Sequence, residues 1–385
     1  MKKLCSVFAA ILIALGILPF RSGEVCCAEE PEISAKAAVL ISADTGEIIY
    51  EHNSSKKLPM ASTTKIMTTL LCLESGGLYE EFVVDSEAIR VEGSSMGLRE
   101  GDIVTKYALC CGMLLPSGND AANAAAVRIA GNIEDFAVMM NDRAREMGLS
   151  RTFFVTPSGL EGEGHGSSAY DMAILAREAL KNEMFREICS QTSIQLEFGN
   201  PPYKRWLKNT NKLLTMCDGV YGVKTGFTDE AGRCLVSACS RDGMELICVT
   251  LNDRNDWEDH SRLYDYGFSC VRKTEIPLPD EFELDLAGAD SDKLTVALKE
   301  LPMTVTSAGI DTEKISFRVI APPFVYAPVN CGDEAAQVEI SFGGREIRRI
   351  PLYAKEDAGV KKHKSSPKKK NWFEKIISKV GGIFS

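Results

Sequence analysis

Residues 58–68 read Leu-Pro-Met-Ala-Ser-Thr-Thr-Lys-Ile-Met-Thr, a proline-containing segment that leads into an apolar run. Pro59 and Ser62 before that run predict a buried helix that opens near Ala61. On such a helix, Ser62 and Lys65 lie one turn apart on the same face. A lysine that is partly desolvated at a helix start can have a lowered pKa and remove the proton of a serine hydroxyl. The stretch therefore predicts a serine nucleophile with a lysine base.

The Ser-x-x-Lys pattern is weak by itself, because it occurs four times in the chain, beginning at Ser54, Ser62, Ser365 and Ser366. Only the pattern at Ser62 is followed by an apolar helical run. The pattern at Ser54 lies in a polar segment, and the other two lie in a lysine-rich tail. Ser62 is therefore the candidate nucleophile.

A second motif, Ser117-Gly118-Asn119, stands between an apolar segment and the alanine-rich run 121–126. A loop at this point would present a hydroxyl and a carboxamide, which could relay a proton to a leaving amine and hold a substrate amide. The alternative is that Ser117 or Asn119 caps the following helix.

A third motif, Lys224-Thr225-Gly226, follows a glycine turn and is expected on a strand. A cation, a hydroxyl and a glycine that permits close backbone approach suit a carboxylate-bearing substrate laid along a strand edge. Each tripeptide has an ordinary structural interpretation, but the three in this order favour a common site.

Ser-x-x-Lys at 62, Ser-x-Asn at 117 and Lys-Thr-Gly at 224 together resemble the signature of penicillin-binding proteins and serine β-lactamases. Within that superfamily, residues 58–68, 115–122, 167–173 and 218–226 are similar to segments of low-molecular-mass D-alanyl-D-alanine carboxypeptidases. The resemblance extends over most of the chain, because those enzymes also have a β-rich domain after the catalytic one and an amphipathic C-terminal anchor.

The resemblance implies that Ser62 attacks the carbonyl between two terminal D-alanines of a peptidoglycan stem peptide, with Lys65 as the base. Ser117 would pass the proton to the departing D-alanine. The oxyanion would lie between the backbone N–H groups of Ser62 and Phe227. The implied substrate-binding residues are Asn119, Lys224, Thr225 and Gly226. Penicillin would acylate Ser62 and leave slowly, and no cofactor or metal is implied.

Three details around the motifs remain open. Phe227 follows Lys-Thr-Gly where some relatives have a polar side chain, so substrate contacts at that side chain are uncertain. Arg254 is either an additional carboxylate contact or a surface arginine. Ser167 or Ser168 can cap a helix that Asp171 completes as a capping box.

The catalytic part is expected to be α+β, an antiparallel sheet with a helical subdomain of the β-lactamase/transpeptidase type. Residues 37–51 predict a β-hairpin, residues 107–181 have an alanine-rich helical pattern, and strand-like runs return near 235 and at 246–251. This domain is assigned to residues 29–270.

A small all-β domain is expected over residues 276–355, because the apolar pattern there has a period of two. Phe282, Leu284 and Leu286, for example, alternate with acidic residues. No catalytic cluster is evident in this part, so it is interpreted as a spacer or interaction module.

The two ends of the chain predict export and attachment to a membrane. Residues 1–28 have the three zones of a signal peptide, with cleavage after Ala28, and an uncleaved anchor is the alternative. Residues 358–385 carry eight lysines and one glutamate, a net charge of +7, with an apolar helical face. They are expected to bind an anionic membrane surface, and a disordered solvated tail is the alternative. The predicted location is the outer face of the bacterial cytoplasmic membrane or the cell wall.

Composition excludes two classes of protein. A net charge of −10 argues against a general nucleic-acid binder. The four histidines are scattered and no Cys-x-x-Cys pair occurs, which argues against a metal enzyme. Most cysteines lie in apolar runs and are interpreted as buried thiols, although a disulfide between Cys234 and Cys248 stays open.

Three rival functions remain. A class A β-lactamase needs a glutamate for deacylation, and the nearest Glu-x-x-Asn string, at Glu197, lies closer to Lys224 than expected. A D,D-endopeptidase or weak transpeptidase would use the same residues as the carboxypeptidase. A non-catalytic penicillin-sensing, wall-binding protein is disfavoured, because Ser62, Lys65 and Ser117 are intact.

Overall fold

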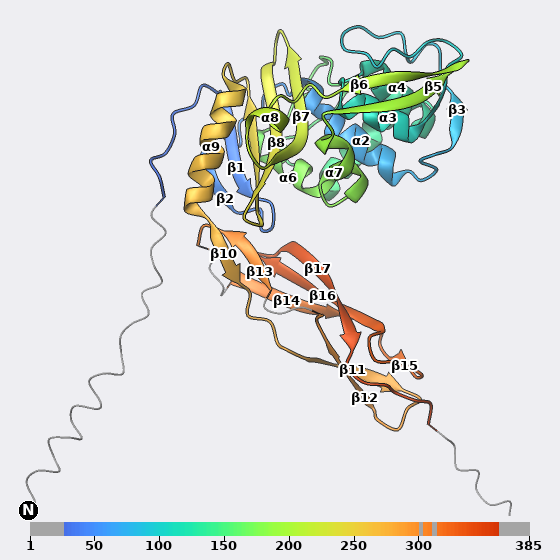
Figure 1. Cartoon of the computed structure of the whole chain (residues 1–385), viewed down its shortest axis with the longest axis vertical. Helices are drawn as coiled ribbons and strands as arrows, with labels where there is room; N and C mark the ends of the chain where they lie inside the picture. The colour runs from blue at the N-terminus through green and yellow to red at the C-terminus, as the bar shows by residue number, and fades with distance from the viewer. Residues whose placement is uncertain (1–26, 300–302, 310–313, 362–385) are drawn as a thin grey trace, which may run out of the picture. The chain divides into compact units, whose positions relative to one another are not determined.

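The computed structural model describes residues 27–299, 303–309 and 314–361. The chain forms two compact units (Figure 1). The first contains Met1–Glu275 and Thr304–Ile310, and the second contains Ile276–Met303 and Asp311–Ser385. The fold class is α+β, as predicted.

The first unit is built on a five-stranded antiparallel sheet in the order β2-β1-β9-β8-β7. Its strands are β1 (Ala37–Ser42), β2 (Ile48–His52), β7 (Val220–Thr228), β8 (Gly232–Arg241) and β9 (Met244–Leu251). The predicted hairpin over 37–51 is confirmed as β1 and β2.

Helices cover both faces of this sheet, which explains why every residue of β1 is buried. Helix α9 (Asp256–Cys270) packs on one face, where Leu40 and Leu263 share a core. Helices α2 (Lys65–Glu74) and α6 (Ala169–Ala179) pack on the other face, where Val39 lies (Figure 1). A strand covered on both sides reads as a continuous apolar run instead of an alternating one.

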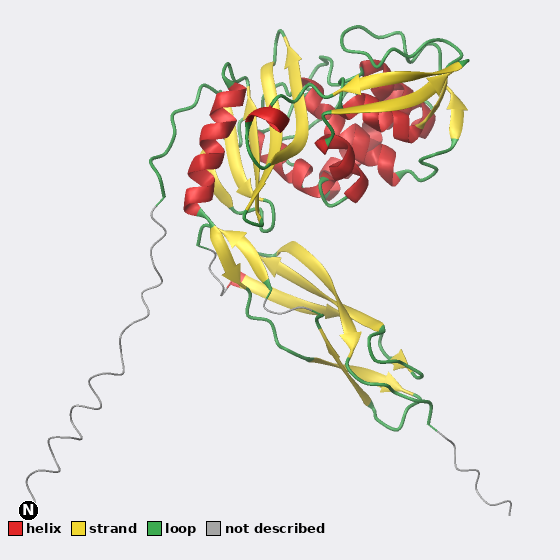
Figure 2. Ribbon diagram, in the orientation of Figure 1, coloured by secondary structure: helices red, strands yellow, loops and turns green. Residues whose placement is uncertain are grey.

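The helical subdomain lies beside the sheet (Figure 2). Besides α2 and α6 it contains α3 (Lys106–Leu114), α4 (Asn119–Ala130), α5 (Ile133–Glu146) and α7 (Glu183–Ser190). The helical pattern over 107–181 is thus confirmed for α3 to α6. Gly131 ends α4 with a φ of +86°, a conformation that glycine adopts at low cost.

Shorter elements complete the first unit. The small strand pairs are β3 (Glu81–Val83) with β4 (Ile103–Thr105), β5 (Ser193–Gly199) with β6 (Pro202–Lys208), and β10 (Arg272–Glu275) with β13 (Thr304–Ser307). A one-turn helix, α8 (Leu213–Met216), precedes β7. Strand β13 lies within the range 276–355 but belongs to this unit, because it pairs with β10.

The second unit contains strands and no α-helix among its described residues (Figure 2). Its sheet has the order β14-β16-β17-β12-β11-β15. The strands are β11 (Phe282–Ala287), β12 (Lys293–Ala297), β14 (Ile315–Ile320), β15 (Val325–Tyr326), β16 (Glu334–Phe342) and β17 (Arg345–Ala354). Phe282, Leu284 and Leu286 are buried, as their alternation predicts, whereas Phe317 on the edge strand β14 is exposed.

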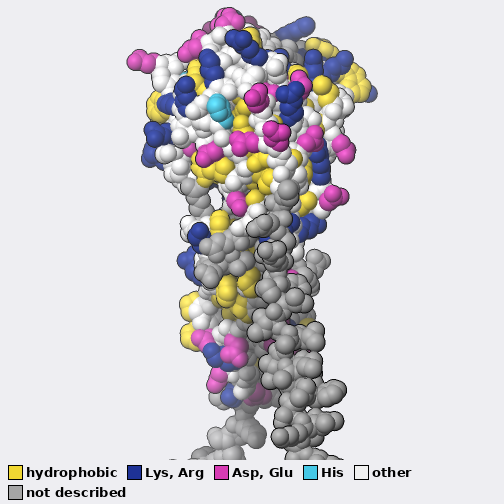
Figure 3. Space-filling model, turned by 90° about the vertical axis from the view of Figure 1, so that its left-hand side faces the viewer, with side chains coloured by type: hydrophobic (Ala, Val, Ile, Leu, Met, Phe, Trp, Pro, Cys, Tyr) yellow, Lys and Arg dark blue, Asp and Glu magenta, His cyan; other side chains and the backbone are white. Residues whose placement is uncertain are grey.

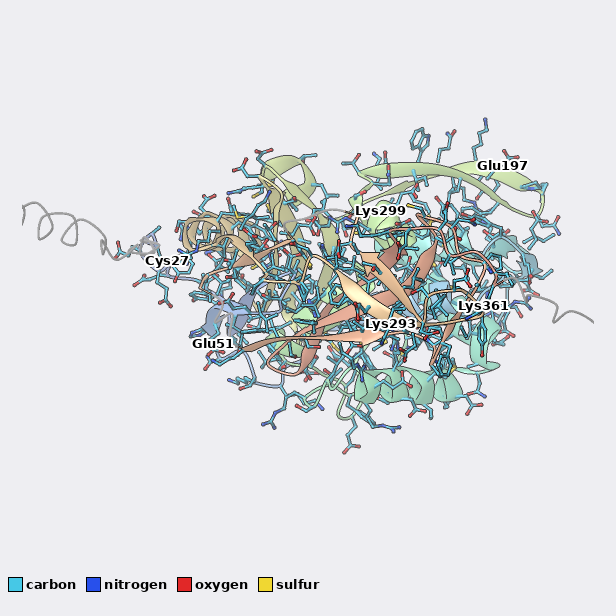
Figure 4. The ribbon with its side chains drawn as sticks, turned by 90° about the horizontal axis from the view of Figure 1, so that it is seen from below. Cys27, Glu51, Glu197, Lys293, Lys299 and Lys361 are labelled. Carbon is cyan, nitrogen blue, oxygen red and sulfur yellow. A yellow bond between two sulfur atoms is a disulfide. The ribbon has the colours of Figure 1, made fainter. Side chains whose placement is uncertain are left out.

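Among the described residues, eight cysteines are buried thiols, as expected, and Cys27, which Figure 4 labels, forms a disulfide with Cys270. Cys234 and Cys248 are both free, so the alternative of a disulfide between them is wrong. Cleavage after Ala28 would remove Cys27 from the mature protein, and the observed pairing therefore favours a mature N-terminus at or before Cys27.

The surface of the first unit has acidic and basic side chains interspersed on the face that Figure 3 shows. No described helix is both long and apolar enough to cross a membrane. The signal peptide predicted over 1–28 and the basic helix predicted within 358–385 lie almost wholly outside the described residues.

Candidate active site

Ser62 lies in a short 3-10 helix (Ala61–Thr64) that leads directly into α2. The half-buried Ser62 Oγ is 2.9 Å from Lys65 Nζ, as the one-turn spacing predicts. The ammonium of Lys65 also donates to Asn119 Oδ1 at 2.7 Å and to the Ser158 carbonyl at 2.6 Å. Three acceptors therefore hold the lysine nitrogen next to the serine hydroxyl.

Lys65 has no exposed surface, and this burial lowers the pKa of its ammonium well below the usual range. The charge of Lys224 lowers the pKa further, whereas the carboxylate of Asp120 raises it. A lysine in these surroundings is neutral at a much lower pH than a lysine in water, so it can accept the proton of Ser62.

Ser117 occupies the turn between α3 and α4 and lines the same cavity as Ser62. Its φ of +65° is a strained conformation for a residue with a side chain, and Ala61, just before Ser62, has a φ of +47°. Such strain is common at functional sites, where the surrounding structure holds it. The N-cap of α4 is Gly118, without a side-chain cap, so capping by Ser117 or Asn119 is not observed.

The Lys-Thr-Gly motif lies on β7, the edge strand of the central sheet, which confirms that it is on a strand. A Cβ on Gly226 would lie 3.1 Å from the backbone nitrogen of Ser62. Glycine therefore lets β7 pass directly against the turn that carries Ser62. Thr225 Oγ1 is hydrogen-bonded to Thr210 Oγ1 at 2.7 Å.

Lys224 is 1% exposed and donates from Nζ to the Thr225 carbonyl at 2.8 Å. Burial lowers the pKa of Lys224 to about 7. Two buried lysines thus lie near one site, and an anion bound there would be attracted to Lys224 in its charged form.

A cavity of about 340 Å³ opens at this point. It is lined by Ser62, Ser94, Ser117, Thr210, Lys212, Thr225, Gly226, Phe227, Arg233, Asp256 and Trp257. The side chain of Phe227 is 63% exposed. Arg233 is paired with Asp256 and lies over the ring of Trp257, so a guanidinium is fixed in the cavity wall.

A second cavity of about 450 Å³ lies next to the residues that precede Ser62. Pro59, Met60 and Ala61 line it together with the segment 159–165. His165 in this wall is hydrogen-bonded through Nε2 to Thr64 Oγ1 at 2.9 Å. Burial, and then the charge of Lys57, lower the pKa of His165 to about 4, so its ring is neutral near pH 7.

Two residues that the sequence analysis considered, Arg254 and Glu197, do not lie at this site. Arg254 is exposed and does not line the cavity, whereas Arg233 does. Glu197 is exposed on the β5–β6 hairpin (Figure 4) and is paired in register with Lys204. It does not line the cavity that contains Ser62, so it does not supply the glutamate that a class A β-lactamase needs.

The capping prediction near 167–171 is confirmed for Ser168 and wrong for the capping box. Ser168, not Ser167, caps α6 and accepts from the Asp171 N–H at 3.1 Å. The Asp171 carboxylate does not complete a capping box. It accepts instead from the Arg151 N–H at 2.7 Å and from Thr152 Oγ1 at 2.8 Å.

Sequence reasoning missed three contributors to the site. Ser158 acts through a backbone carbonyl, which any residue could supply, so no sequence signal marks it. Arg233 and Thr210 lie near Lys224-Thr225-Gly226 along the chain. This proximity in sequence is their only signal, because β8 is continuously buried over residues 234–239 and does not alternate.

Known proteins are similar to this chain along most of its length. Residues 24–255 match the family model described as "D-alanyl-D-alanine carboxypeptidase". The D-alanyl-D-alanine carboxypeptidase DacF of Bacillus subtilis is 32% identical over 93% of this chain and 95% of that protein. DacC of Escherichia coli is 30% identical over 86% of this chain and 85% of that protein.

Solved structures are similar as well. The D-alanyl-D-alanine carboxypeptidase DacD from Francisella tularensis superposes with a TM-score of 0.61 at 25% identity, over 89% of this chain and all of that one. The Streptomyces K15 DD-transpeptidase superposes with a TM-score of 0.60 at 29% identity, over 63% of this chain and all of that one. The fold, the site and these likenesses agree, and the chain belongs to the D-alanyl-D-alanine carboxypeptidase family of serine peptidases.

Proposed function

We propose that the protein is a serine-type D-Ala-D-Ala carboxypeptidase that removes the terminal D-alanine from peptidoglycan stem peptides. The observation that carries the proposal is the 2.9 Å contact between Ser62 Oγ and the buried ammonium of Lys65, whose pKa burial lowers. Family membership supports the same reaction.

In the proposed acylation, Ser62 Oγ attacks the carbonyl carbon between the two D-alanines while neutral Lys65 takes the hydroxyl proton. The backbone N–H groups of Ser62 and Phe227 hold the negative charge that develops on the carbonyl oxygen. Because Gly226 brings β7 against Ser62, these two backbone segments are close enough to act together.

The tetrahedral intermediate then collapses. The C–N bond breaks, and Ser117 Oγ passes a proton from Lys65 to the departing D-alanine nitrogen. Ser117 lines the same cavity as Ser62, which supports this role. The product is free D-alanine and an ester between Ser62 and the shortened peptide.

The remaining motif residues would bind the substrate. Lys224 and Thr225 would hold the terminal carboxylate, because both lie on the edge strand beside the cavity and Lys224 brings a buried cation. Gly226 leaves room for the peptide backbone. Asn119 would position the peptide amide, since its side chain already contacts Lys65.

Hydrolysis completes the cycle. Water attacks the ester, Lys65 accepts a proton from that water, and Ser62 Oγ leaves with the proton that Lys65 returns. β-Lactams would acylate Ser62 in the same way, because their ring carbonyl and carboxylate occupy the positions of the scissile carbonyl and the terminal carboxylate.

We also infer that the protein is exported and held at the outer face of the cytoplasmic membrane. The segment 1–28 and the lysine-rich tail 358–385 support this inference. The purified full chain should sediment with vesicles that contain anionic lipid, and deletion of 358–385 should abolish this. Equal sedimentation of both chains would contradict the role of the tail.

The reaction is tested by release of free D-alanine from an acyl-Lys-D-Ala-D-Ala peptide by the purified full chain. Ser62→Ala should release none and should gain no covalent penicilloyl mass, while its thermal unfolding stays close to that of the wild type. A penicilloyl adduct on Ser62→Ala would show that another residue is the nucleophile. Penicillin acylation of the wild type without D-alanine release would favour an endopeptidase or a penicillin sensor.

A further inference from the structure

Residues 92–98 form a loop between β3 and β4, called here the 92–98 loop. It lies against the turn that carries the second motif, Ser117-Gly118-Asn119. The backbone N–H of Asn119 donates to the Ser94 carbonyl at 2.7 Å, and Asn119 Nδ2 donates to the Glu92 carbonyl at 2.7 Å. Because Nδ2 is held by Glu92, Asn119 must direct Oδ1 toward Lys65. The loop therefore determines which end of the Asn119 amide faces the lysine.

The 92–98 loop is held by the carboxylate of Asp120, which is 2% exposed, and also by Arg205, which donates to the Gly97 carbonyl at 2.7 Å. Asp120 Oδ1 accepts from the N–H of Met96 at 2.9 Å and from the N–H of Ala121 at 2.9 Å. Asp120 Oδ2 accepts from Ser95 Oγ at 2.6 Å and from the N–H groups of Gly97 and Leu98, each at 3.0 Å. Four of these five donors belong to the loop, and hydrogen bonds to an ionised acceptor are stronger than neutral ones.

The packing around this carboxylate leaves little freedom. A Cβ on Gly118 would lie 2.6 Å from Asp120 Oδ1 and 2.9 Å from the Met96 nitrogen. A Cβ on Gly93, whose φ is +86°, would lie 2.8 Å from Asn119 Nδ2. Residues 93–97 also match Gly-x-Ser-x-Gly, the pattern of a nucleophile elbow. They form this loop instead of a strand-to-helix turn, and the Ser95 hydroxyl donates a hydrogen bond to Asp120.

We propose that Asp120 is a positioning residue for the reaction: its carboxylate fixes the 92–98 loop, which fixes the amide of Asn119 against Lys65. The same loop places Ser94 in the wall of the cavity that contains Ser62. This inference rests on the proposed function, because it assigns to Lys65 the role of the base.

The charge of Asp120 gives the inference a second measurable consequence. The groups that act on the Lys65 ammonium are Lys224, which lowers its pKa, and Asp120, which raises it; the atoms that touch it, on Ser62, Asn119 and Ser158, are neutral. Replacing Asp120 with a neutral residue should therefore lower the pKa of Lys65. Replacing a residue that only supports the fold would not change the pKa of Lys65.

The test compares the wild-type full chain with Asp120→Asn in the rate of acylation by benzylpenicillin, measured from pH 5 to pH 10. Asparagine has the shape of aspartate but cannot accept from all five donors. We expect the plateau rate to fall about tenfold or more, because a buried charged group loses hydrogen bonds. We also expect the acidic limb of the profile to shift to lower pH.

Asp171→Asn is a matched control. Asp171 is also a buried aspartate, 4% exposed, in the first turn of a helix, and it also holds a loop segment through its carboxylate. Its replacement should lower the melting temperature without moving the acidic limb. An equal shift of the limb in Asp171→Asn would overturn the inference, because the shift would then reflect general loosening.

A double-mutant cycle with Asn119→Ala tests the route of the effect. If Asp120 acts through Asn119, Asp120→Asn should reduce the plateau rate much less in the Asn119→Ala background than in the wild type. Equal reductions in both backgrounds, or a plateau in Asp120→Asn equal to that of the wild type, would overturn the inference.

Ser95→Ala tests the same claim with a smaller change, in case Asp120→Asn does not fold. Ser95 is exposed, and its replacement removes two hydrogen bonds of the 92–98 loop: the one that Ser95 Oγ donates to Asp120 at 2.6 Å and the one that it accepts from the Gly97 N–H at 2.8 Å. We expect acylation to slow by about two- to fivefold. An unchanged rate in a variant that folds would count against the inference. Wild-type acylation without D-alanine release would refute the proposed substrate but leave this test valid, because acylation still depends on Lys65.

Discussion

Gly226 and Ser62 lie so close that a Cβ on the glycine would stand 3.1 Å from the backbone nitrogen of the serine. Two other backbone atoms, the Met60 oxygen and the Thr63 nitrogen, lie at the same distance. A strand from late in the chain thus meets the turn that carries the nucleophile, and this contact brings the third motif to the first.

Gly226→Ala should therefore separate β7 from Ser62 and slow penicillin acylation. All three neighbours are backbone atoms, so the strand or the turn must shift, at a cost of about 1–3 kcal/mol in stability. Stopped-flow acylation and thermal unfolding would measure the two effects. Gly359→Ala is the control, because a Cβ there meets nothing within 4 Å. Normal acylation in Gly226→Ala would contradict the close approach.

The pH dependence of kcat/KM for D-alanine release should be bell-shaped. Lys65 must be neutral to accept a proton, so the rate should rise as the pH passes its lowered pKa. Lys224 must be charged to hold a carboxylate, so the rate should fall as the pH rises past its pKa of about 7 in the free enzyme.

Lys224→Arg distinguishes the two limbs. An arginine stays protonated at all pH values used, so the alkaline limb should move to higher pH even where the rate is lower. The acidic limb should remain. An alkaline limb that stays in place in Lys224→Arg would show that another group causes it.

A buried polar network in the core of the first unit makes stability depend on pH. His260 has no exposed surface and is hydrogen-bonded to Ser237 Oγ at 2.6 Å and to Thr250 Oγ1 at 3.0 Å. Burial lowers the pKa of His260 to about 3. Below about pH 6.5 the unfolded chain binds a proton at this histidine and the folded chain does not, so stability falls as the pH falls from 6.5 toward 3.

His260→Gln should reduce this pH dependence. The free energy of unfolding, measured in urea at pH 7 and at pH 5, should differ less in the variant than in the wild type, by about 1–2 kcal/mol. His165, with a pKa lowered to about 4, contributes in the same direction and remains in the variant. His52→Gln, at an exposed position, is the control. An unchanged difference in His260→Gln would mean that the ring is charged inside the fold.

The sequence predicted those parts of the site that depend on short spacing along the chain. Ser62 and Lys65 are three residues apart on a helical turn, and Lys224 to Gly226 share one strand, so residue identity and local structure determine their relation. The 92–98 loop could not be predicted in the same way. It acts through carbonyl and N–H groups, which every residue has, and through contacts between distant segments.

In the fold, too, the elements with a local sequence signal were predicted and those that depend on tertiary contacts were not. The central strands are continuous apolar runs and α3 to α6 lie in an alanine-rich helical pattern, so both were predicted, whereas the β5–β6 hairpin and α9 were not. On β6, Arg205 is buried through its ion pair with Asp102 and Trp206 is 63% exposed, although Leu207 is buried, so burial along this strand does not follow side-chain polarity. A tertiary ion pair of this kind has no local signal in the sequence.

The disulfide between Cys27 and Cys270 makes a prediction about the mature N-terminus. Because Cys27 lies one residue before the cleavage point expected after Ala28, the exported protein can carry this disulfide only if processing occurs at or before Cys27. We expect the intact mass of the secreted protein to include Cys27 and to rise by about 2 Da on reduction. Cys270→Ser should remove that change and lower stability by about 2–4 kcal/mol. A mature chain that begins at Glu29 would show that the pairing does not persist after export.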